Sequence, residues 1–350
     1  MNKIDILSLR YEELEQQLLD MGEKKYRAKQ IFSALHKRKV SDFLQITEIS
    51  AQLRADLEAM FYIESLNIDK KLVSKIDNTV KYLYELSDGN CIESVMMSYK
   101  HGNSLCISTQ VGCKMGCAFC ASTIAGYERN LTPSEMLLQL YEAEKNSGSE
   151  VGSMVLMGIG EPFDNYDNLL TFLDILTHKD GHNMSLRHVS VSTCGVVDKI
   201  YDLAKHRYGL SLSISLHAVD DKRRNELMPI NKRYNINELL SACRHYFEKT
   251  GRRIYFEYAV IEGVNDSEND AKKLASLLKG MACHVNIIPI NEVIERDFKA
   301  SKKAYEFAQL LKSMGLTATV RRTLGTDINA ACGQLRREAT KSGKKVECST

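Results

Sequence analysis

The chain has 350 residues, 44% of them hydrophobic, and a formal net charge of +2. This length predicts one catalytic domain of roughly 200 to 250 residues with a smaller domain attached. No apolar run approaches the ~18 residues of a membrane span, and the chain starts with no secretory signal, so we expect a cytoplasmic protein that contacts no membrane. The ten cysteines are expected to stay reduced in that compartment.

Residues 1–75 carry apolar side chains at helical spacing and no strand-like alternation, which predicts a small helical domain. Lysine and arginine crowd one stretch of this region, at Lys24, Lys25, Arg27, Lys29, Lys37, Arg38 and Lys39. Such a group suits a phosphate backbone, although most basic runs are merely solvated surfaces.

Residues 76–98 are predicted to form a β-hairpin that connects this domain to the rest of the chain. Strand-like runs at 79–86 (TVKYLYEL) and 91–97 (CIESVMM) flank the turn Ser87-Asp88-Gly89-Asn90. A turn of this composition between two such runs is typical of antiparallel strands.

From residue 99 to 330, strand-like runs alternate with amphipathic helices. The runs are 104–110 (SLCISTQ), 153–158 (SMVLMG), 188–193 (HVSVST), 211–217 (SLSISLH), 254–260 (IYFEYAV) and 284–290 (HVNIIPI), with 317–322 (TATVRR) as a candidate edge strand. The first crossover helix has a clear start, because residues 132–135 (TPSE) form a capping box with proline at the first helical position. About six βα units predict an α/β fold with a partial (βα)6 barrel, whose active site lies at the carboxyl ends of the strands.

The most informative motif is Cys113–Cys120 (CKMGCAFC), directly after the first of these runs. Three thiolates at this spacing suit an iron–sulfur cluster with one iron left unligated and open to chemistry. A zinc knuckle that borrows a remote His or Cys is the plainer alternative. Other candidate residues also follow strands, namely Gly160, Glu161, Ser192, Ser215, Leu216, His217 and Asn291. Because the carboxyl ends of parallel strands meet at one edge of a sheet, we expect these residues to share a site.

The three-cysteine motif resembles the signature of the radical S-adenosylmethionine (SAM) enzymes. The resemblance implies a [4Fe-4S] cluster ligated by Cys113, Cys117 and Cys120, with SAM on the open iron as the source of a 5′-deoxyadenosyl radical. It also implies that the turn at Gly160 and Glu161 presents backbone oxygens to the SAM ammonium group. The other implied SAM-binding residues are Ser192, Ser215, Leu216, His217 and Asn291. For His217, a core histidine satisfied by the backbone is an equal alternative.

Two further cysteines narrow the resemblance: Cys106, before the cluster motif, and Cys332, within Asp327–Leu335 (DINAACGQL). Over nearly its whole length the chain is similar to the RlmN/Cfr family of RNA adenine methyltransferases. Supporting stretches are 26–30 (YRAKQ), 108–113 (STQVGC), 129–131 (RNL), 158–162 (GIGEP), 228–231 (MPIN) and 263–266 (GVND). The loop after Asn291 departs from the family pattern, because it reads EVIE at 292–295.

The resemblance implies a methyl transfer that consumes two SAM molecules per turnover. Cys332, in a tail formed by residues 331–350, first accepts a methyl group, because a thiolate is a good nucleophile where adenine carbon is not. A radical from the second SAM takes hydrogen from the S-methyl group, and the methylene adds to carbon-2 of adenine. Cys106 then attacks the Cys332 sulfur, which forms a disulfide and releases the base. Glu93 matches the family's proton acceptor, although the sequence alone favours an exposed strand carboxylate.

The implied substrates are single-stranded, namely an adenosine in the peptidyl-transferase loop of 23S rRNA and the adenosine next to the tRNA anticodon. Residues 1–75 and two further basic groups would hold phosphates. These groups are Lys222, Arg223, Arg224, Lys232 and Arg233 after the fourth run, and Arg321, Arg322, Arg336, Arg337, Lys341, Lys344 and Lys345 near the C-terminus. An electron donor such as flavodoxin or ferredoxin and a monomeric state complete the expectation.

Three alternatives stay open at this point. A carbon-8 methyltransferase of 23S rRNA, which confers antibiotic resistance, would use the same cysteines, but Val111 favours carbon-2. A non-catalytic iron–sulfur protein that binds RNA or senses redox state would not need Cys106, Cys332 and the turn at Gly160 together. A radical SAM activase of another protein would carry no methyl group on Cys332. The other cysteines, Cys91, Cys194, Cys243, Cys283 and Cys348, are assigned to packing.

Overall fold

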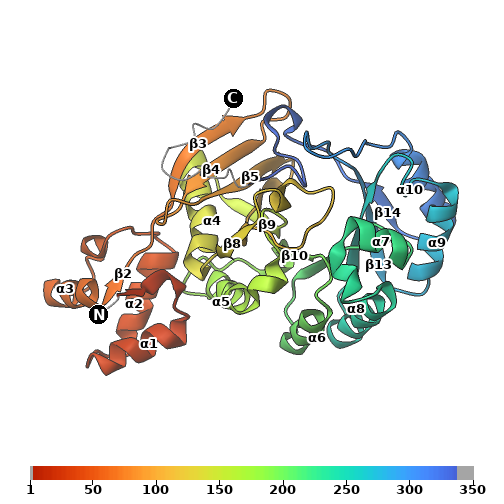
Figure 1. Ribbon diagram of the computed structural model, residues 1–350. Helices are drawn as coiled ribbons and strands as arrows, with labels where there is room; N and C mark the ends of the chain where they lie inside the picture. Colours follow the sequence, from red (N-terminus) through yellow and green to blue (C-terminus); the bar gives the residue numbers. More distant parts are fainter. Residues whose placement is uncertain (1–2, 337–350) are drawn as a thin grey trace.

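The computed structural model describes residues 3–336, and its centre is a ten-stranded sheet (Figure 1). The strand order across the sheet is β14-β13-β12-β11-β10-β9-β6-β5-β4-β3. Pairing is parallel from β14 to β6 and antiparallel from β6 to β3. Within residues 3–336, β14 and β3 are the two edges of this sheet, so the barrel is open.

The parallel strands are the six predicted runs together with the candidate edge strand. Their bounds are β6 (Gly102–Cys106), β9 (Val151–Leu156), β10 (Val189–Thr193), β11 (Ser211–Ser215), β12 (Ile254–Val260), β13 (Cys283–Pro289) and β14 (Ala318–Val320). The side chains of Leu105, Val191 and Phe256 are fully buried in one large core that these strands share with the helices. The predicted α/β fold with a partial parallel barrel is confirmed.

Helices alternate with these strands as predicted. They are α4 (Pro133–Ser147), α5 (Tyr166–Thr177), α6 (Val197–His206), α7 (Asp221–Leu227), α8 (Ile236–Thr250), α9 (Glu268–Leu278) and α10 (Ala304–Ser313). Figure 1 shows α5, α6, α8 and α9 following one another along one side of the molecule. The start of α4 is the predicted one, because the Thr132 hydroxyl accepts the Glu135 N–H and the Glu135 carboxylate accepts the Thr132 N–H.

The predicted hairpin is present as β4 (Val80–Glu85) and β5 (Cys91–Tyr99), but it is part of the barrel sheet. β5 pairs with β6, and β3 (Asn67–Val73) pairs with β4, so three antiparallel strands extend the parallel ones. The expectation of no strand in residues 1–75 is therefore wrong at β3, and also at the two-residue strands of residues 4–5 and 61–62. Its sequence NIDKKLV puts Lys70 between Ile68 and Leu72 on one face, so the apolar alternation that marks a strand is broken.

The N-terminal residues form the predicted helical unit. Its elements are β1 (Ile4–Asp5), α1 (Tyr11–Asp20), α2 (Tyr26–His36), α3 (Ala51–Met60) and β2 (Phe61–Tyr62). Leu14 and Phe32 of this unit belong to the same buried core as the barrel strands. Tyr11 also stacks on His178, with ring centroids 4.5 Å apart, so the unit packs directly on the loop after α5.

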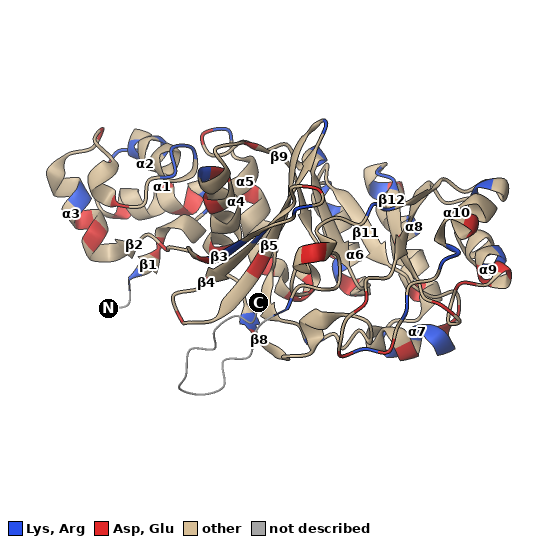
Figure 2. Cartoon of the chain, turned by 90° about the horizontal axis from the view of Figure 1, so that it is seen from above, with Lys and Arg blue, Asp and Glu red and all other residues tan. Residues whose placement is uncertain are grey.

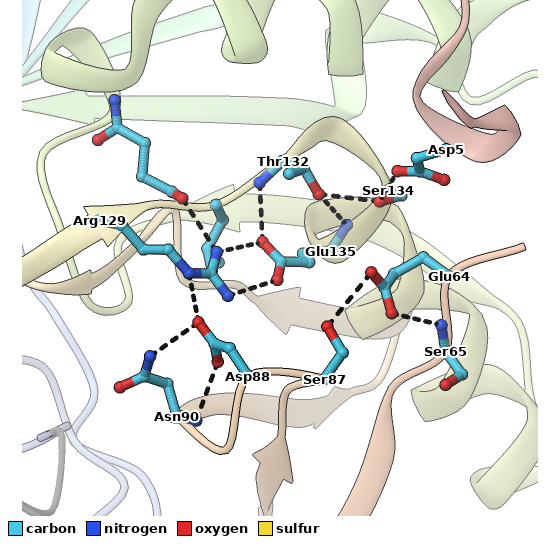
Figure 3. Close-up of polar contacts among 12 residues, drawn as sticks. Asp5, Glu64, Ser65, Ser87, Asp88, Asn90, Arg129, Thr132, Ser134 and Glu135 are labelled. Carbon is cyan, nitrogen blue, oxygen red and sulfur yellow. Dashed lines mark hydrogen bonds and ion pairs between the residues drawn. The ribbon is translucent and has the colours of Figure 1, made fainter. Parts of the chain in front are cut away.

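A polar network joins the N-terminal unit, the hairpin turn and the start of α4 (Figure 3). Arg129 donates to Asp88 of the turn at 2.7 Å and to both carboxylate oxygens of Glu135 at 2.8 Å. The Ser134 hydroxyl donates to the Asp5 carboxylate at 2.5 Å, and burial raises the pKa of Asp5. Because a bidentate Arg–carboxylate pair fixes both distance and angle, Arg129 holds the turn against α4.

The basic stretch of the N-terminal unit is largely neutralised by acidic neighbours, and Figure 2 shows both signs interspersed on its helices. The ion pairs are Lys25–Glu15, Arg27–Glu23, Lys29–Asp180, Arg38–Glu48 and Lys39–Glu144. A solvated, ion-paired surface therefore accounts for most of this stretch, and Lys24 and Lys37 are its exposed cations outside these pairs.

No helix within residues 3–336 combines the length and the hydropathy that crossing a membrane requires.

Candidate functional site

A cavity lies at the carboxyl ends of the parallel strands, and we refer to it as the cluster cavity. The predicted site residues that line it are Cys113, Cys117, Cys120, Gly160, Glu161, Ser192, Ser215, His217, Asn291 and Cys332. The predicted site residues outside its lining are Leu216, Cys106 and Glu93. Strands, the loops between them and the C-terminal tail thus converge on one site, as the position of the motifs after successive strands predicts.

The cluster loop, residues 113–120, is framed by two short strands. β7 (Gln110–Gly112) pairs with β8 (Tyr127–Asn130), so the chain returns to its starting point after the loop. Gly112 has a φ of +74°, and a Cβ there would lie 1.8 Å from the Gly126 carbonyl oxygen, so only glycine fits. The N–H of Ala118 donates to the Leu227 carbonyl at 2.9 Å, which ties the loop to the end of α7.

The three thiols of the loop have the chemistry that a cluster needs. Cys113 is buried, and Cys117 and Cys120 are half-buried. Burial raises the pKa of Cys113 to about 12 and raises that of Cys117 well above its usual value. Such thiols stay protonated at neutral pH unless a cationic centre binds them, as iron does.

The arrangement of the thiols also bears on the zinc alternative. Across residues 3–336, no three His, Cys, Asp or Glu side chains are placed to hold a single metal ion. A zinc knuckle requires its ligands to converge on one ion, whereas a cluster takes each thiolate on a separate iron. Cys113, Cys117 and Cys120 line one cavity, which suits a cluster.

The turn after β9 packs closely on the segment that leads from β6 into β7. A Cβ on Gly158 would lie 2.6 Å from the Ile107 carbonyl oxygen, and one on Gly160, whose φ is +108°, would lie 2.6 Å from Gln110 Cβ. The Glu161 carboxylate accepts the N–H groups of Cys194 at 2.7 Å and of Phe163 at 3.0 Å. Burial raises the pKa of Glu161. Its side chain therefore holds the turn against β10, and the backbone of the turn faces the cavity.

The residues at the ends of β10 and β11 differ in their exposure to the cavity. Ser192 and Ser215 line it, whereas Leu216 is fully buried in the core. His217 lines it and accepts the Ala259 N–H at Nδ1, 2.9 Å away, while its ring packs edge-on against Phe119. Burial lowers the pKa of His217 to about 3. It is thus a neutral histidine with one nitrogen satisfied by the backbone, so both interpretations made from the sequence describe part of its environment.

The C-terminal tail lies across the cluster loop. The Gly333 carbonyl accepts the Ala121 N–H at 2.8 Å, and the Leu335 carbonyl accepts the Ser122 hydroxyl at 2.7 Å. Asn291 donates through its side-chain amide to the Cys332 carbonyl at 2.9 Å. These contacts hold Cys332 beside the three cluster thiols.

The loop at 292–295, which departs from the family pattern, supports the same tail. The Glu292 carbonyl accepts the Gln334 side-chain amide at 3.1 Å, and Glu295 forms an ion pair with Arg336 at 2.7 Å. Residues 337–350, which include Arg337, Lys341, Lys344, Lys345 and Cys348, lie outside the described residues.

Cys106 lies in a second cavity, the thiol cavity, which is separate from the cluster cavity but shares a wall with it. Cys332, Asn291, Met157 and Arg321 line both cavities. Burial raises the pKa of Cys106 to about 12. Cys106 and Cys332 are both free thiols in the structure, so a standing disulfide between them is not supported. The expected bond between them belongs to one step of a catalytic cycle and would be reduced again afterwards.

Glu93 does not fit the exposed carboxylate that its sequence context favoured. It is only 6% exposed, and it forms an ion pair with Lys81 at 2.9 Å. It also accepts the backbone N–H of Arg336 at 2.9 Å, so it contacts the tail that carries Cys332. Cross-strand pairing brings Glu93 and Lys81 together on β5 and β4, which a reading of β5 alone does not reveal.

Arg224 was expected to bind RNA phosphate, and the structure contradicts this. Its side chain is 0% exposed and donates to the carbonyls of Cys194 at 2.7 Å and Ser215 at 3.1 Å and to Asn231 Oδ1 at 2.9 Å. Five donors in a planar guanidinium suit this task, since they can join several loop ends at once. Arg223 is also engaged, in an ion pair with Asp270 at 2.6 Å.

Two charged residues of the site were not assigned to it from the sequence: Glu257 was not considered, and Arg321 was expected to hold RNA phosphate with the C-terminal basic group but faces the cavity. Glu257, in β12, and Arg321, directly after β14, line the cluster cavity and lie 3.6 Å apart. Burial raises the pKa of Glu257. The sequence contains a signal for Glu257, because it is the single charged residue in the otherwise apolar run IYFEYAV. A charge at the centre of a barrel strand requires a buried partner.

These features together define a radical SAM enzyme, and comparison with known proteins agrees. Residues 107–275 match the model of the Radical SAM superfamily, and residues 4–63 match that of the ribosomal RNA large subunit methyltransferase N-terminal domain. A radical SAM methyltransferase of known structure from Sphaerobacter thermophilus is 40% identical, with a TM-score of 0.89 over 95% of this chain and 99% of that one.

Full-length relatives identify the family more closely. A probable dual-specificity RNA methyltransferase RlmN of Lachnoclostridium phytofermentans is 48% identical over 97% of this chain and 96% of its own. Another, from Alkaliphilus oremlandii, is 51% identical over 97% of this chain and 99% of its own. The chain belongs to the RlmN family of radical SAM RNA methyltransferases. It is therefore an RNA-modifying enzyme that uses a [4Fe-4S] cluster and SAM, and the non-catalytic and activase alternatives are wrong.

Proposed function

We propose that this protein methylates carbon-2 of adenine in 23S rRNA and in tRNA, through a methyl group carried on Cys332. One observation carries the proposal. Cys332 lines the cluster cavity together with Cys113, Cys117 and Cys120, and it also lines the thiol cavity that holds Cys106. A sulfur shared by two cavities can be modified from one side and released from the other.

Cys113, Cys117 and Cys120 would hold the cluster, because they are the thiols of the cavity that share one loop. When bound, the cluster and SAM supply the methyl group and the radical that opens an otherwise inert C–H bond. The residues assigned to SAM are Gly160, Glu161, Ser192, Ser215, Leu216, His217 and Asn291. For Leu216 the side chain is buried in the core and the backbone N–H donates to the Glu257 carbonyl, so its part in the site would be to fix the chain between Ser215 and His217.

The protein's own residues carry the remaining steps. The Cys332 thiolate accepts the methyl group, because carbon-2 of adenine offers no lone pair to the SAM methyl. Cys106 attacks the Cys332 sulfur when the methylated base is released. Glu93 accepts the ring proton, and its contact with the backbone of Arg336 supports this role by linking it to the same tail.

RNA phosphates would lie on exposed cations around the mouth of the cluster cavity. Lys232 and Arg233 line a surface groove that also includes Met115 of the cluster loop. We divide the chain into an RNA-binding accessory domain (1–75), a hairpin connection (76–98), the radical SAM core (99–330) and the Cys332 tail (331–350). A monomer in the cytoplasm, reduced by a flavodoxin or ferredoxin, completes the proposal.

Carbon-8 of adenine is the alternative target. Val111, which is fully buried in β7 before the cluster loop, is the residue that favours carbon-2. The same two cysteines would serve both positions, so the identity of the product decides between them.

The test is anaerobic reconstitution with methyl-labelled SAM and bacterial 23S rRNA or tRNA, followed by nuclease digestion and mass spectrometry of the nucleosides. We expect 2-methyladenosine from both RNAs, and no methylated nucleoside from Cys332→Ala. Cys283→Ala, which removes a buried thiol of β13, should leave the product unchanged. A yield of 8-methyladenosine would contradict the carbon-2 assignment, and methylation by Cys332→Ala would contradict the role of Cys332.

A further inference from the structure

The thiol that is proposed to release the product is poorly disposed to ionise. Cys106 is buried on β6, and burial raises its pKa to about 12. The nearby Cys332 acts in the same direction, while Arg321 opposes it. Tyr99 and Arg322 are the other titratable or charged groups of the thiol cavity. A thiolate is the attacking form in disulfide chemistry, so Cys106 needs a stabilising charge within this cavity.

Arg321 is placed to supply that charge. Its side chain forms part of the wall between the two cavities, where Cys332 also lies. Its backbone N–H donates to the Ile287 carbonyl at 2.8 Å, and its Nη1 contacts Met157 Sδ at 3.4 Å. It is the single lysine or arginine among the described residues that line the cluster cavity.

Glu257 holds the guanidinium in this position. One carboxylate oxygen accepts the Asn286 side-chain amide at 2.8 Å. The other lies 3.6 Å from Arg321 and, among the described residues, has no hydrogen-bond partner. A buried carboxylate at that distance orients the guanidinium without taking up all five of its N–H donors. Donors remain for the sulfur atoms on the other side of the wall.

We propose that Arg321, oriented by Glu257, is a positioning residue that stabilises the Cys106 thiolate as it attacks the Cys332 sulfur. The inference rests on the function proposed above. In this step the Cys106–Cys332 S–S bond forms and the bond from the Cys332 sulfur to the methylene carbon breaks. The electron pair of the broken bond goes to that carbon, which takes a proton and becomes the methyl group of the base. The two sulfurs are oxidised to a disulfide, and the carbon is reduced.

The first test measures the reactivity of Cys106 in the purified full-length protein. Iodoacetamide alkylation is followed against pH, and each cysteine is quantified by peptide mass spectrometry. In Arg321→Met we expect the pH at which Cys106 becomes reactive to rise by about one unit. At any fixed pH below that value, alkylation of Cys106 should be about tenfold slower. Arg321→Lys should retain most of the rate, because it keeps the charge. Arg322→Met, which changes the neighbouring arginine of the same cavity, should leave the profile in place, and Cys91 serves as the internal reference.

The second test follows one turnover with RNA. Arg321→Met should still acquire a methyl group on Cys332 and should then accumulate a covalent protein–RNA species, because release is slowed at least tenfold. Glu257→Gln should accumulate the same covalent species, but less of it than Arg321→Met does. An unchanged Cys106 profile together with normal release in Arg321→Met overturns the inference. Absence of a methyl group on Cys332 in the unaltered protein would instead contradict the proposed function, and the alkylation result would still decide the role of Arg321.

Discussion

Packing against the segment between β6 and β7 requires glycine at two positions of the turn after β9. At Gly160 the required φ of +108° combines with a clash of 2.6 Å between a new Cβ and Gln110. The sequence predicted glycine there for a different reason, the close approach of a ligand. Glycine at this position can be required by packing and by a ligand at the same time. A measurement of protein stability tests the packing requirement alone, because it is made without a ligand.

We expect Gly160→Ala to destabilise the protein by about 3 kcal/mol, from backbone strain plus overpacking. Gly251→Ala is the matched control, since Gly251 also has positive φ, +66°, but a Cβ there meets nothing within 4 Å. The control should lose only about 1–2 kcal/mol. Chemical denaturation of both variants measures the difference. Equal losses would show that the contact with Gln110 relaxes freely.

The site residues that belong to a short sequence motif could be predicted from the local sequence. The cluster cysteines and Gly160 follow strands within a few residues, so position along the chain was enough. Arg321 and Glu257 are separated by more than sixty residues and meet only because β12, β13 and β14 are neighbours in the sheet. Arg224 was misjudged for a related reason. A charged helix residue is usually solvated, and the four acceptors of the Arg224 side chain lie on other elements.

At the scale of elements, the tail is held on the barrel by a few contacts, and one of them goes to a member of a buried ion pair. Glu93 of β5 pairs with Lys81 of β4 and accepts the Arg336 N–H. The two side chains of the pair are 8% and 11% exposed, so the pair is shielded from water. Removing one partner leaves the other charge buried and also frees the end of the tail.

We therefore expect Glu93→Ala to lower the free energy of local opening at residues 331–336 by about 3 kcal/mol. Hydrogen exchange of the tail peptide reports this opening directly. Glu85→Ala, which removes an exposed carboxylate from the neighbouring β4, should leave the exchange of the tail unchanged. Tail exchange that is the same in Glu93→Ala and in the unaltered protein would show that the contacts of Gly333 and Leu335 with the cluster loop are sufficient.

The order of elements was largely predictable, whereas the extent of the sheet was not. Each parallel strand is a short strand-like run between helices, and in β10 (VSVST) and β11 (SLSIS) apolar residues alternate with serine, which is the period of a strand with two different faces. β3 has an exposed edge and carries lysines toward both faces, so its strand character comes from pairing with β4 rather than from its composition. The hairpin was found from its turn. Its strand β5 also forms a local antiparallel pair with β6, in which Tyr99 lies opposite Gly102. The long-range contact that joins these strands to the barrel is the pairing of β6 with β9.

At the scale of the whole molecule, the N-terminal unit and the barrel share one core, and a buried histidine lies where they meet. His36 of α2 is 1% exposed, contacts the Tyr141 hydroxyl of α4 at 3.1 Å through Nδ1, and packs against Phe32. Its Nε2 is buried and has no hydrogen-bond partner among the described residues. Burial lowers the pKa of His36 from 6.5 to about 3. The folded protein therefore keeps this ring neutral under conditions in which the unfolded chain protonates it.

This difference predicts how the stability depends on pH. Between about pH 6.5 and pH 3 the unfolded chain binds a proton that folded His36 does not, so acid favours unfolding. The contribution of His36 is fully present above pH 6.5 and is lost as the pH falls, by about 1.4 kcal/mol per unit. His36→Gln keeps an acceptor for Tyr141 and cannot titrate, so its stability should fall less steeply than that of the unaltered protein between pH 6.5 and pH 4.5. Urea denaturation of both proteins across this range measures the two slopes, and the carboxylates common to both cancel in the comparison. Parallel slopes would mean that the junction opens and hydrates His36 before the rest of the core unfolds, and the N-terminal unit would then be a separate cooperative unit rather than part of one core.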